Sequence, residues 1–236
     1  MKSNFEKTAA WGRGWQASGN WKPHTMGHED ATNAAYNYLK FIQDICGGMP
    51  LPGKTEGMDV GAGAGFFSAA FTKFGINMVA TEWNDDGINL IRQENPQLQT
   101  RKIDVLTFHE PTSKDFIFCR ELYPFTRVNA FTDQYETISR LIDSLKPGGV
   151  LVIVGSDILR PHCADWELLI RSFRTDKRLA LVSARYLELL MRRRKYWGRL
   201  GCFGYWTAAA ILWPFLAYKK RFHSWALISA IVFRKK

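Results

Sequence analysis

Three glycines at alternate positions, Gly61, Gly63 and Gly65, follow Met58, Asp59 and Val60. Glycine has no Cβ, so this spacing lets the backbone turn sharply and approach a bound molecule closely. The mostly apolar residues 66–71 favour a helix, whose first N–H groups have no partner within the helix. The stretch therefore predicts the end of a strand, a loop that holds a nucleotide-like ligand, and a helix.

The glycine spacing argues against NAD as that ligand. The dinucleotide fingerprint G-x-G-x-x-G needs its third glycine at position 66, where this chain has Phe66. The spacing here is G-x-G-x-G instead.

Further segments place polar residues where a strand is expected to end. Glu82 closes the run 77–82, and Asp104 and Val105 follow Ile103. The run 115–121 reads as another strand, and a Lys-Pro-Gly-Gly turn leads into the apolar run 150–154. Strands that alternate with helices form a parallel sheet, and ligands bind at the carboxyl ends of its strands. These segments are therefore expected around one crevice.

This ordered set resembles the class I S-adenosylmethionine-dependent methyltransferase family, whose pattern has an acidic residue, here Asp59, two positions before the first glycine. The resemblance extends to residues 224–233, which are similar to the family's last strand. It implies an α/β fold with a doubly wound, mostly parallel, seven-stranded Rossmann-like sheet and an antiparallel last strand.

The resemblance also implies S-adenosyl-L-methionine as the cofactor. It places Glu82 at both ribose hydroxyls, Asp104 at the adenine amino group and Val105 against the adenine ring. No metal ion is expected. The residues expected to meet the cofactor are Asp59, Gly61, Ala62, Gly63, Gly65, Glu82, Trp83, Asp104, Val105 and Cys119.

Candidate catalytic residues follow the same strand ends. Methyl transfer from a sulfonium is an in-line displacement, so the protein aligns donor and acceptor and removes the acceptor's proton where there is one. In the family, the acceptor approaches the methyl group beside the segment that here contains Glu121 and Tyr123, and His109 follows another strand. Each of the three is either a general base or a pocket wall or ion-pair partner.

The acceptor is expected to be a small or lipid-linked molecule, with O-methylation favoured. Family members that methylate nucleic-acid bases usually carry Asn or Asp, then Pro-Pro and an aromatic residue, after the fourth strand, and residues 119–125 do not. Two alternatives remain: a nucleic-acid-directed methyltransferase that uses the basic C-terminal region, and a non-catalytic cofactor-binding interaction module.

Composition predicts one globular domain over residues 1–236, since 46% of the residues are hydrophobic and 23% are charged. Four separated cysteines without a C-x-x-C pair, and no secretory leader, favour a cytoplasmic protein without disulfides. The net charge of +10 arises in the C-terminal third, which points to an anionic partner or to a solvated basic face.

Two segments lie outside the predicted core of this domain. Residues 1–50 are expected to form an N-terminal lid or cap, and residues 190–221 a hydrophobic insertion before the last strand. Within the insertion, the uncharged residues 200–218 lie between the basic clusters 192–195 and 219–221. A membrane span would put the last strand on the wrong side, so the segment either makes peripheral contact with an anionic membrane or roofs the substrate pocket.

Overall fold

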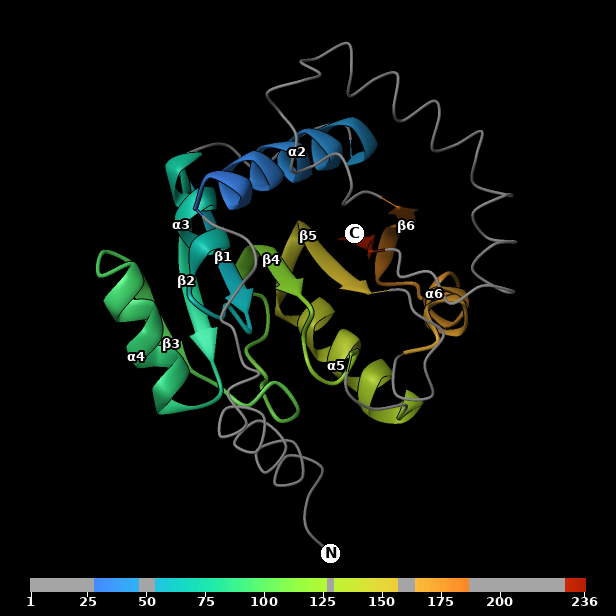
Figure 1. The fold of residues 1–236 in the computed structure, drawn as a ribbon. Coiled ribbons are helices and arrows are strands. Elements are labelled where there is room, and N and C mark those ends of the chain that lie inside the picture. The colour runs from blue at the N-terminus through green and yellow to red at the C-terminus, as the bar shows by residue number, and fades with distance from the viewer. Residues whose placement is uncertain (1–27, 47–53, 127–129, 157–163, 187–227) are drawn as a thin grey trace, which may run out of the picture.

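The structure is a computed structural model that describes residues 28–46, 54–126, 130–156, 164–186 and 228–236 (Figure 1). Its helices are α2 (His28–Cys46), α3 (Phe66–Lys73), α4 (Asp85–Glu94), α5 (Phe131–Ser144) and α6 (Trp166–Phe173). Its strands are β1 (Thr55–Val60), β2 (Ile76–Glu82), β3 (Gln99–Lys102), β4 (Lys114–Arg120), β5 (Leu145–Ser156), β6 (Leu179–Tyr186) and β7 (Ile228–Lys235).

The strands form one seven-stranded sheet in the order β3-β2-β1-β4-β5-β7-β6. The first five strands pair in parallel, and β7 inserts antiparallel between β5 and β6. The chain first adds strands outward from β1 to β3 and then continues from β4 on the other side of β1, so the order reverses between β1 and β4. The predicted fold class, including the antiparallel last strand, is confirmed.

Two predicted boundaries differ from the structure. The last strand continues to Lys235, beyond the predicted end at 233, while residues 224–227 of its predicted start lie outside the described residues. The Lys-Pro-Gly-Gly turn lies inside β5, because Leu145 already pairs with Lys114 before the register shifts at Phe116. Gly148, with φ +77°, supplies the backbone conformation that this irregularity needs.

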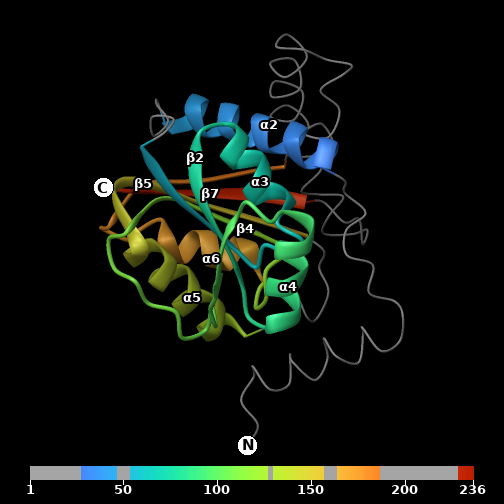
Figure 2. The same cartoon turned by 90° about the vertical axis from the view of Figure 1, so that its left-hand side faces the viewer.

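Helices cover both faces of the sheet (Figure 2). Side chains of a strand alternate between faces, so Phe116 and Phe118 pack with α2 and α3, whereas Ile117 and Cys119 pack with α5 and α6. Both sets are buried, which explains why the central strands are continuous apolar runs in the sequence.

A cluster of aromatic rings fixes α3 against the sheet and against α2. The ring centroid of Phe118 lies 5.0 Å from those of Phe67 and Phe71 and 5.4 Å from that of Tyr38. Such contacts add to the burial of apolar area. Because α3 begins directly after the glycines, this packing holds the glycine loop at the end of β1.

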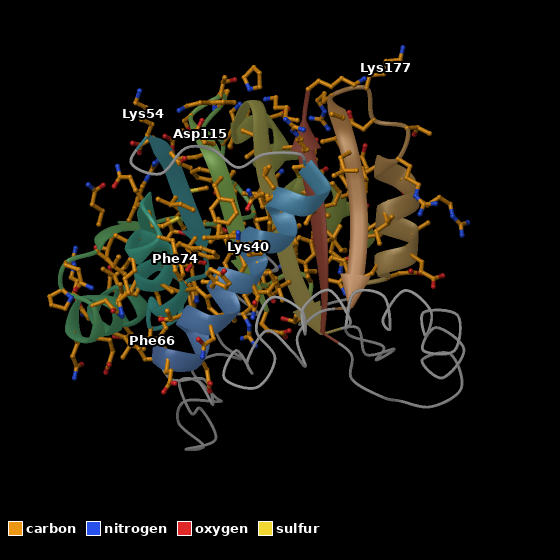
Figure 3. The ribbon with its side chains drawn as sticks, turned by 90° about the horizontal axis from the view of Figure 1, so that it is seen from above. Lys40, Lys54, Phe66, Phe74, Asp115 and Lys177 are labelled. Carbon is orange, nitrogen blue, oxygen red and sulfur yellow. The ribbon has the colours of Figure 1, made fainter. Side chains whose placement is uncertain are left out.

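The two edges of the sheet are distinct in Figure 3, where Phe66 lies at the opposite end from Lys54, Asp115 and Lys177. Phe66 begins α3 and marks the carboxyl edge of the parallel strands. None of the helices in the described ranges is long and apolar enough to cross a membrane. The predicted insertion 190–221 and residues 1–27 and 47–50 of the predicted cap lie outside the described residues. The described part of the cap is α2, which packs on α3.

Candidate cofactor site at the carboxyl edge

The three glycines of the loop adopt backbone conformations that favour glycine. Gly61, Gly63 and Gly65 have φ values of +73°, +60° and +80°. A Cβ on Gly61 would lie 2.7 Å from Cδ1 of Leu122, and one on Gly65 would lie 3.1 Å from Cγ2 of Ile91. The alternate spacing seen in the sequence thus corresponds to a loop that side chains would distort.

Backbone and side-chain hydrogen bonds fasten this loop to its neighbours. The N–H groups of Gly61 and Ala62 donate to the carbonyl of Thr81, at 3.1 and 2.9 Å. The buried amide of Asn95 donates to the carbonyl of Ala64 at 2.8 Å. The loop is therefore connected to the end of β2 and to the end of α4 before any ligand binds.

The carboxylate of Glu82 joins the loop to β2. Its Oε1 accepts the N–H of Gly63 at 2.8 Å, and its Oε2 accepts the N–H of Trp83 at 3.2 Å. Burial raises the pKa of Glu82, and the two N–H groups oppose this rise. Each oxygen keeps a second lone pair, so the carboxylate retains acceptor capacity for two neighbouring hydroxyl groups. This fits the predicted contact with a ribose.

Sequence reasoning missed Gly87, which makes room for Glu82. A Cβ on this residue would lie 2.9 Å from Cγ of Glu82, and the N–H of Gly87 donates to the Asn84 cap of α4 at 2.6 Å. The signal available in the sequence was the glycine itself, because a glycine in the first turn of a helix lowers helix stability and so indicates a need for space.

Asp104 and Val105 lie in a turn attached to Glu82. The N–H of Ile103 donates to the carbonyl of Glu82 at 2.9 Å, and Oδ1 of Asp104 accepts the N–H of Leu106 at 2.9 Å. Val105 is half-buried and packs against the apolar cluster beneath it. The structure therefore brings both predicted adenine contacts next to the predicted ribose contact.

Asp59 lies beneath the loop, with 2% of its surface exposed. Its Oδ2 accepts the hydroxyl of Ser68 at 2.7 Å, and the backbone N–H of Ser68 also donates to the carboxylate. The pKa of Asp59 is raised to about 7, mainly by burial and also by the charge of Glu82, while the hydrogen bonds from Ser68 and the charge of Arg120 oppose this rise. In this position Asp59 fixes the start of α3. The polar Ser68 in an otherwise apolar stretch was a signal for such a buried partner.

A pH-dependent contribution to stability follows from the burial of Asp59. The pKa in the folded chain, about 7, lies above the ordinary value of 3.8, so the folded state binds this proton more tightly. The resulting stabilisation is complete below about pH 4 and is lost as the pH rises through about 7. We expect Asp59→Asn, which cannot ionise, to gain free energy of unfolding relative to the wild type as the pH rises from about 4 to about 7, with no further gain above that pH.

Urea unfolding at several pH values measures this difference. Asp86→Asn, which changes an exposed residue of α4, is the matched control and should follow the wild type at every pH. Parallel pH profiles for Asp59→Asn and the wild type would show that Asp59 does not titrate in this range.

Two predicted catalytic residues lie beside the loop, directly after β4. Glu121 has a φ of +51°, rare for a residue with a side chain, and its N–H donates to the carbonyl of Val154 at 2.8 Å. Tyr123 is half-buried. Leu122, which lies between Glu121 and Tyr123 in the sequence, contacts the position that a Cβ on Gly61 would take. The strained conformation of Glu121 is the kind that clusters at functional sites.

The structure gives less support to His109 and to the side chain of Cys119. His109 is exposed, and its neighbour Glu110 pairs with Arg101 of β3 and, at 3.9 Å, with Lys114 at the start of β4. Cys119 is fully buried, and burial raises its pKa, so only its backbone is able to meet a ligand. Within the described ranges, His, Cys, Asp and Glu form no group of three or more that could hold a metal ion.

This fold and site define the class of protein. The sheet has the antiparallel last strand that the sequence resemblance implied, and the glycine loop meets the acidic end of β2 at the carboxyl edge. Residues 58–153, which contain the glycine loop and the acidic end of β2 but not the last strand, match the family described as "Methyltransferase domain". Residues 58–153 thus form a methyltransferase domain of the class I S-adenosylmethionine-dependent type, and S-adenosylmethionine is the cofactor of this family.

One curated relative is also a methyltransferase. The chain is 25% identical over 136 residues to trans-aconitate 2-methyltransferase of Agrobacterium fabrum, an overlap of 54% of this chain and 51% of that protein. The chain thus spans about half the length of this curated relative.

Solved structures share the fold. A TehB-like SAM-dependent methyltransferase from Corynebacterium glutamicum has a TM-score of 0.56 and 16% identity, over 98% of this chain and 97% of that chain. Phosphoethanolamine N-methyltransferase 1 of Haemonchus contortus, in complex with phosphoethanolamine and S-adenosylhomocysteine, has a TM-score of 0.61 and 12% identity, over 99% of this chain and 50% of that chain.

Proposed function

We propose that this chain transfers the methyl group of S-adenosylmethionine to an oxygen atom of a small-molecule or lipid-linked acceptor. The observation that carries the proposal is the arrangement at the carboxyl edge, where the loop held by Glu82 adjoins the segment with Glu121 and Tyr123. The similarity to a methyltransferase named for a small organic acid supports a small acceptor.

The chain's own residues would bind the cofactor, orient it and remove the proton of the acceptor. The glycine loop and Glu82 would hold the cofactor, whose sulfonium supplies the methyl group, and Asp104 would orient the adenine. Glu121 or Tyr123 would accept the proton of a hydroxyl acceptor, since both follow β4 directly. A carboxylate acceptor is already ionised at neutral pH and would need only alignment.

An acceptor screen tests this function. Purified protein is incubated with S-adenosylmethionine and, in separate reactions, with organic acids, phenols, lipid-linked alcohols and single-stranded nucleic acid, and release of S-adenosylhomocysteine is measured. We expect turnover with an oxygen acceptor, and a lower kcat without weaker S-adenosylhomocysteine binding in Glu121→Gln or Tyr123→Phe. Turnover on a nucleic-acid base, or cofactor binding without turnover on any acceptor, would favour the two alternative functions.

We further propose that residues 190–221 attach the enzyme reversibly to anionic membranes. Support comes from the sequence, in which basic clusters flank the uncharged residues 200–218. Each Lys or Arg near an anionic surface contributes at most about 1 kcal/mol. Neutralising Arg192, Arg193, Arg194 and Lys195 should therefore weaken flotation with anionic vesicles at low salt, as should high salt. If wild-type protein stays in the soluble fraction with such vesicles, the segment serves another purpose.

A further inference from the structure

Arg120 lies at a position that the proposed function leaves without a role. It is the last residue of β4, and its neighbour Cys119 pairs with Val60 at the end of β1. The guanidinium carbon lies 5.7 Å from the centre of the Phe67 ring, in the first turn of α3. Its charge also lowers the pKa of Asp59, which places it near the buried carboxylate beneath the loop.

The order of the strands indicates which part of the cofactor would reach Arg120. Adenine is expected at the end of β3 and ribose at the end of β2, and β1 and β4 follow in the same direction across the sheet. The remaining part of the cofactor, its amino-acid tail, therefore extends over the glycine loop toward β4. Adjacent strands lie about 4.8 Å apart, so β2 and β4 are separated by roughly 10 Å, a distance that this extended tail is able to cover.

The tail ends in the cofactor's one anionic group, a carboxylate. Asp59 and Glu82 already bring two carboxyl groups to this edge, and their charges would repel a third. A guanidinium offsets that repulsion and can bind a carboxylate through two parallel hydrogen bonds. The face of Phe67 favours a cation at this position and limits its movement.

We propose that Arg120 binds the carboxylate of the amino-acid tail of S-adenosylmethionine and of its product. The inference rests on the proposed function, because it assumes that the cofactor occupies the crevice. It assigns to Arg120 a contact with the cofactor and not with the methyl acceptor.

Calorimetry with two ligands tests the assignment. One ligand is S-adenosylhomocysteine, and the other is its analogue that lacks only the carboxylate. In the wild type, loss of the carboxylate should weaken binding about 10- to 100-fold, as for one charged hydrogen-bonded contact. In Arg120→Gln the two ligands should bind almost equally, and Arg120→Lys, which keeps the charge without the fork, should show an intermediate ratio. Arg140→Gln removes an arginine on α5 that pairs with Glu136, and it should keep the wild-type ratio.

Each outcome of this experiment supports or overturns the assignment of Arg120 to the cofactor's carboxylate. A wild-type ratio retained in Arg120→Gln would overturn the assignment, above all if the same variant raises the KM of an anionic acceptor. If Arg120→Gln does not fold, an undiminished ratio in Arg120→Lys would overturn it equally. A wild type that binds neither ligand would remove the proposed function together with this inference, whereas a wild type that binds both ligands equally would remove the inference alone.

Discussion

Gly63→Val is expected to weaken S-adenosylhomocysteine binding by about a hundredfold to a thousandfold while the chain still unfolds cooperatively. Gly63 has a φ of +60°, a conformation that a β-branched residue adopts only under strain. If the loop relaxes to relieve this strain, the N–H of Gly63 moves away from Oε1 of Glu82. The same substitution places a side chain where the backbone is expected to approach the cofactor.

Gly148→Val is the matched control for this substitution. Gly148 has a similar φ of +77°, and no atom lies within 4 Å of the position that its Cβ would take. It lies in the irregular start of β5, at the edge of the sheet opposite the loop. The control should lose stability through backbone strain and keep its affinity. Wild-type affinity in Gly63→Val, or equal losses of affinity in both variants, would show that this loop does not hold the cofactor.

Glu82→Ala should reduce cofactor affinity about a hundredfold, and Asp104→Ala only about fivefold to tenfold. The carboxylate of Glu82 accepts hydrogen bonds from the backbone N–H groups of Gly63 and Trp83. It is expected to accept hydrogen bonds from both ribose hydroxyls as well. Asp104 already uses Oδ1 within its own turn and would offer the adenine one contact. Glu82→Gln, which keeps the shape and one acceptor oxygen, should fall between the two.

Titration calorimetry of the three variants with S-adenosylhomocysteine gives this order directly. Thermal unfolding in the absence of ligand separates a loss of affinity from a loss of structure. Small and equal losses for Glu82→Ala and Asp104→Ala would mean that the ends of β2 and β3 do not contact the cofactor.

The sequence alone was sufficient to predict the order of the central strands along the chain. Parallel strands that are buried on both faces are apolar runs, and Gly61 and Glu82 mark the carboxyl ends of β1 and β2. The start of β5 was not predictable in this way. It depends on the pairing of Leu145 with Lys114, which lies in a distant part of the chain, and the local glycines indicate only a turn.

The site was predicted only in part, because its contacts also depend on the pairing of distant parts of the chain. The residues of the loop and Glu82 follow from their order along the chain, but their partners depend on which strands become neighbours. Ser68 beneath the loop and Arg120 beside Asp59 required the adjacency of α3, β1 and β4. Asp59 was predicted as a cofactor contact, and its position before the first glycine did not reveal that its carboxylate accepts hydrogen bonds from α3.

Binding of S-adenosylmethionine to the wild-type chain is the most direct test of the account. Equilibrium dialysis with labelled cofactor should give one molecule bound per chain, displaced by S-adenosylhomocysteine and not by NAD. Saturable binding that Gly63→Val weakens at least about a hundredfold would agree with the site at the carboxyl edge. Absence of binding, or displacement by NAD, would contradict it.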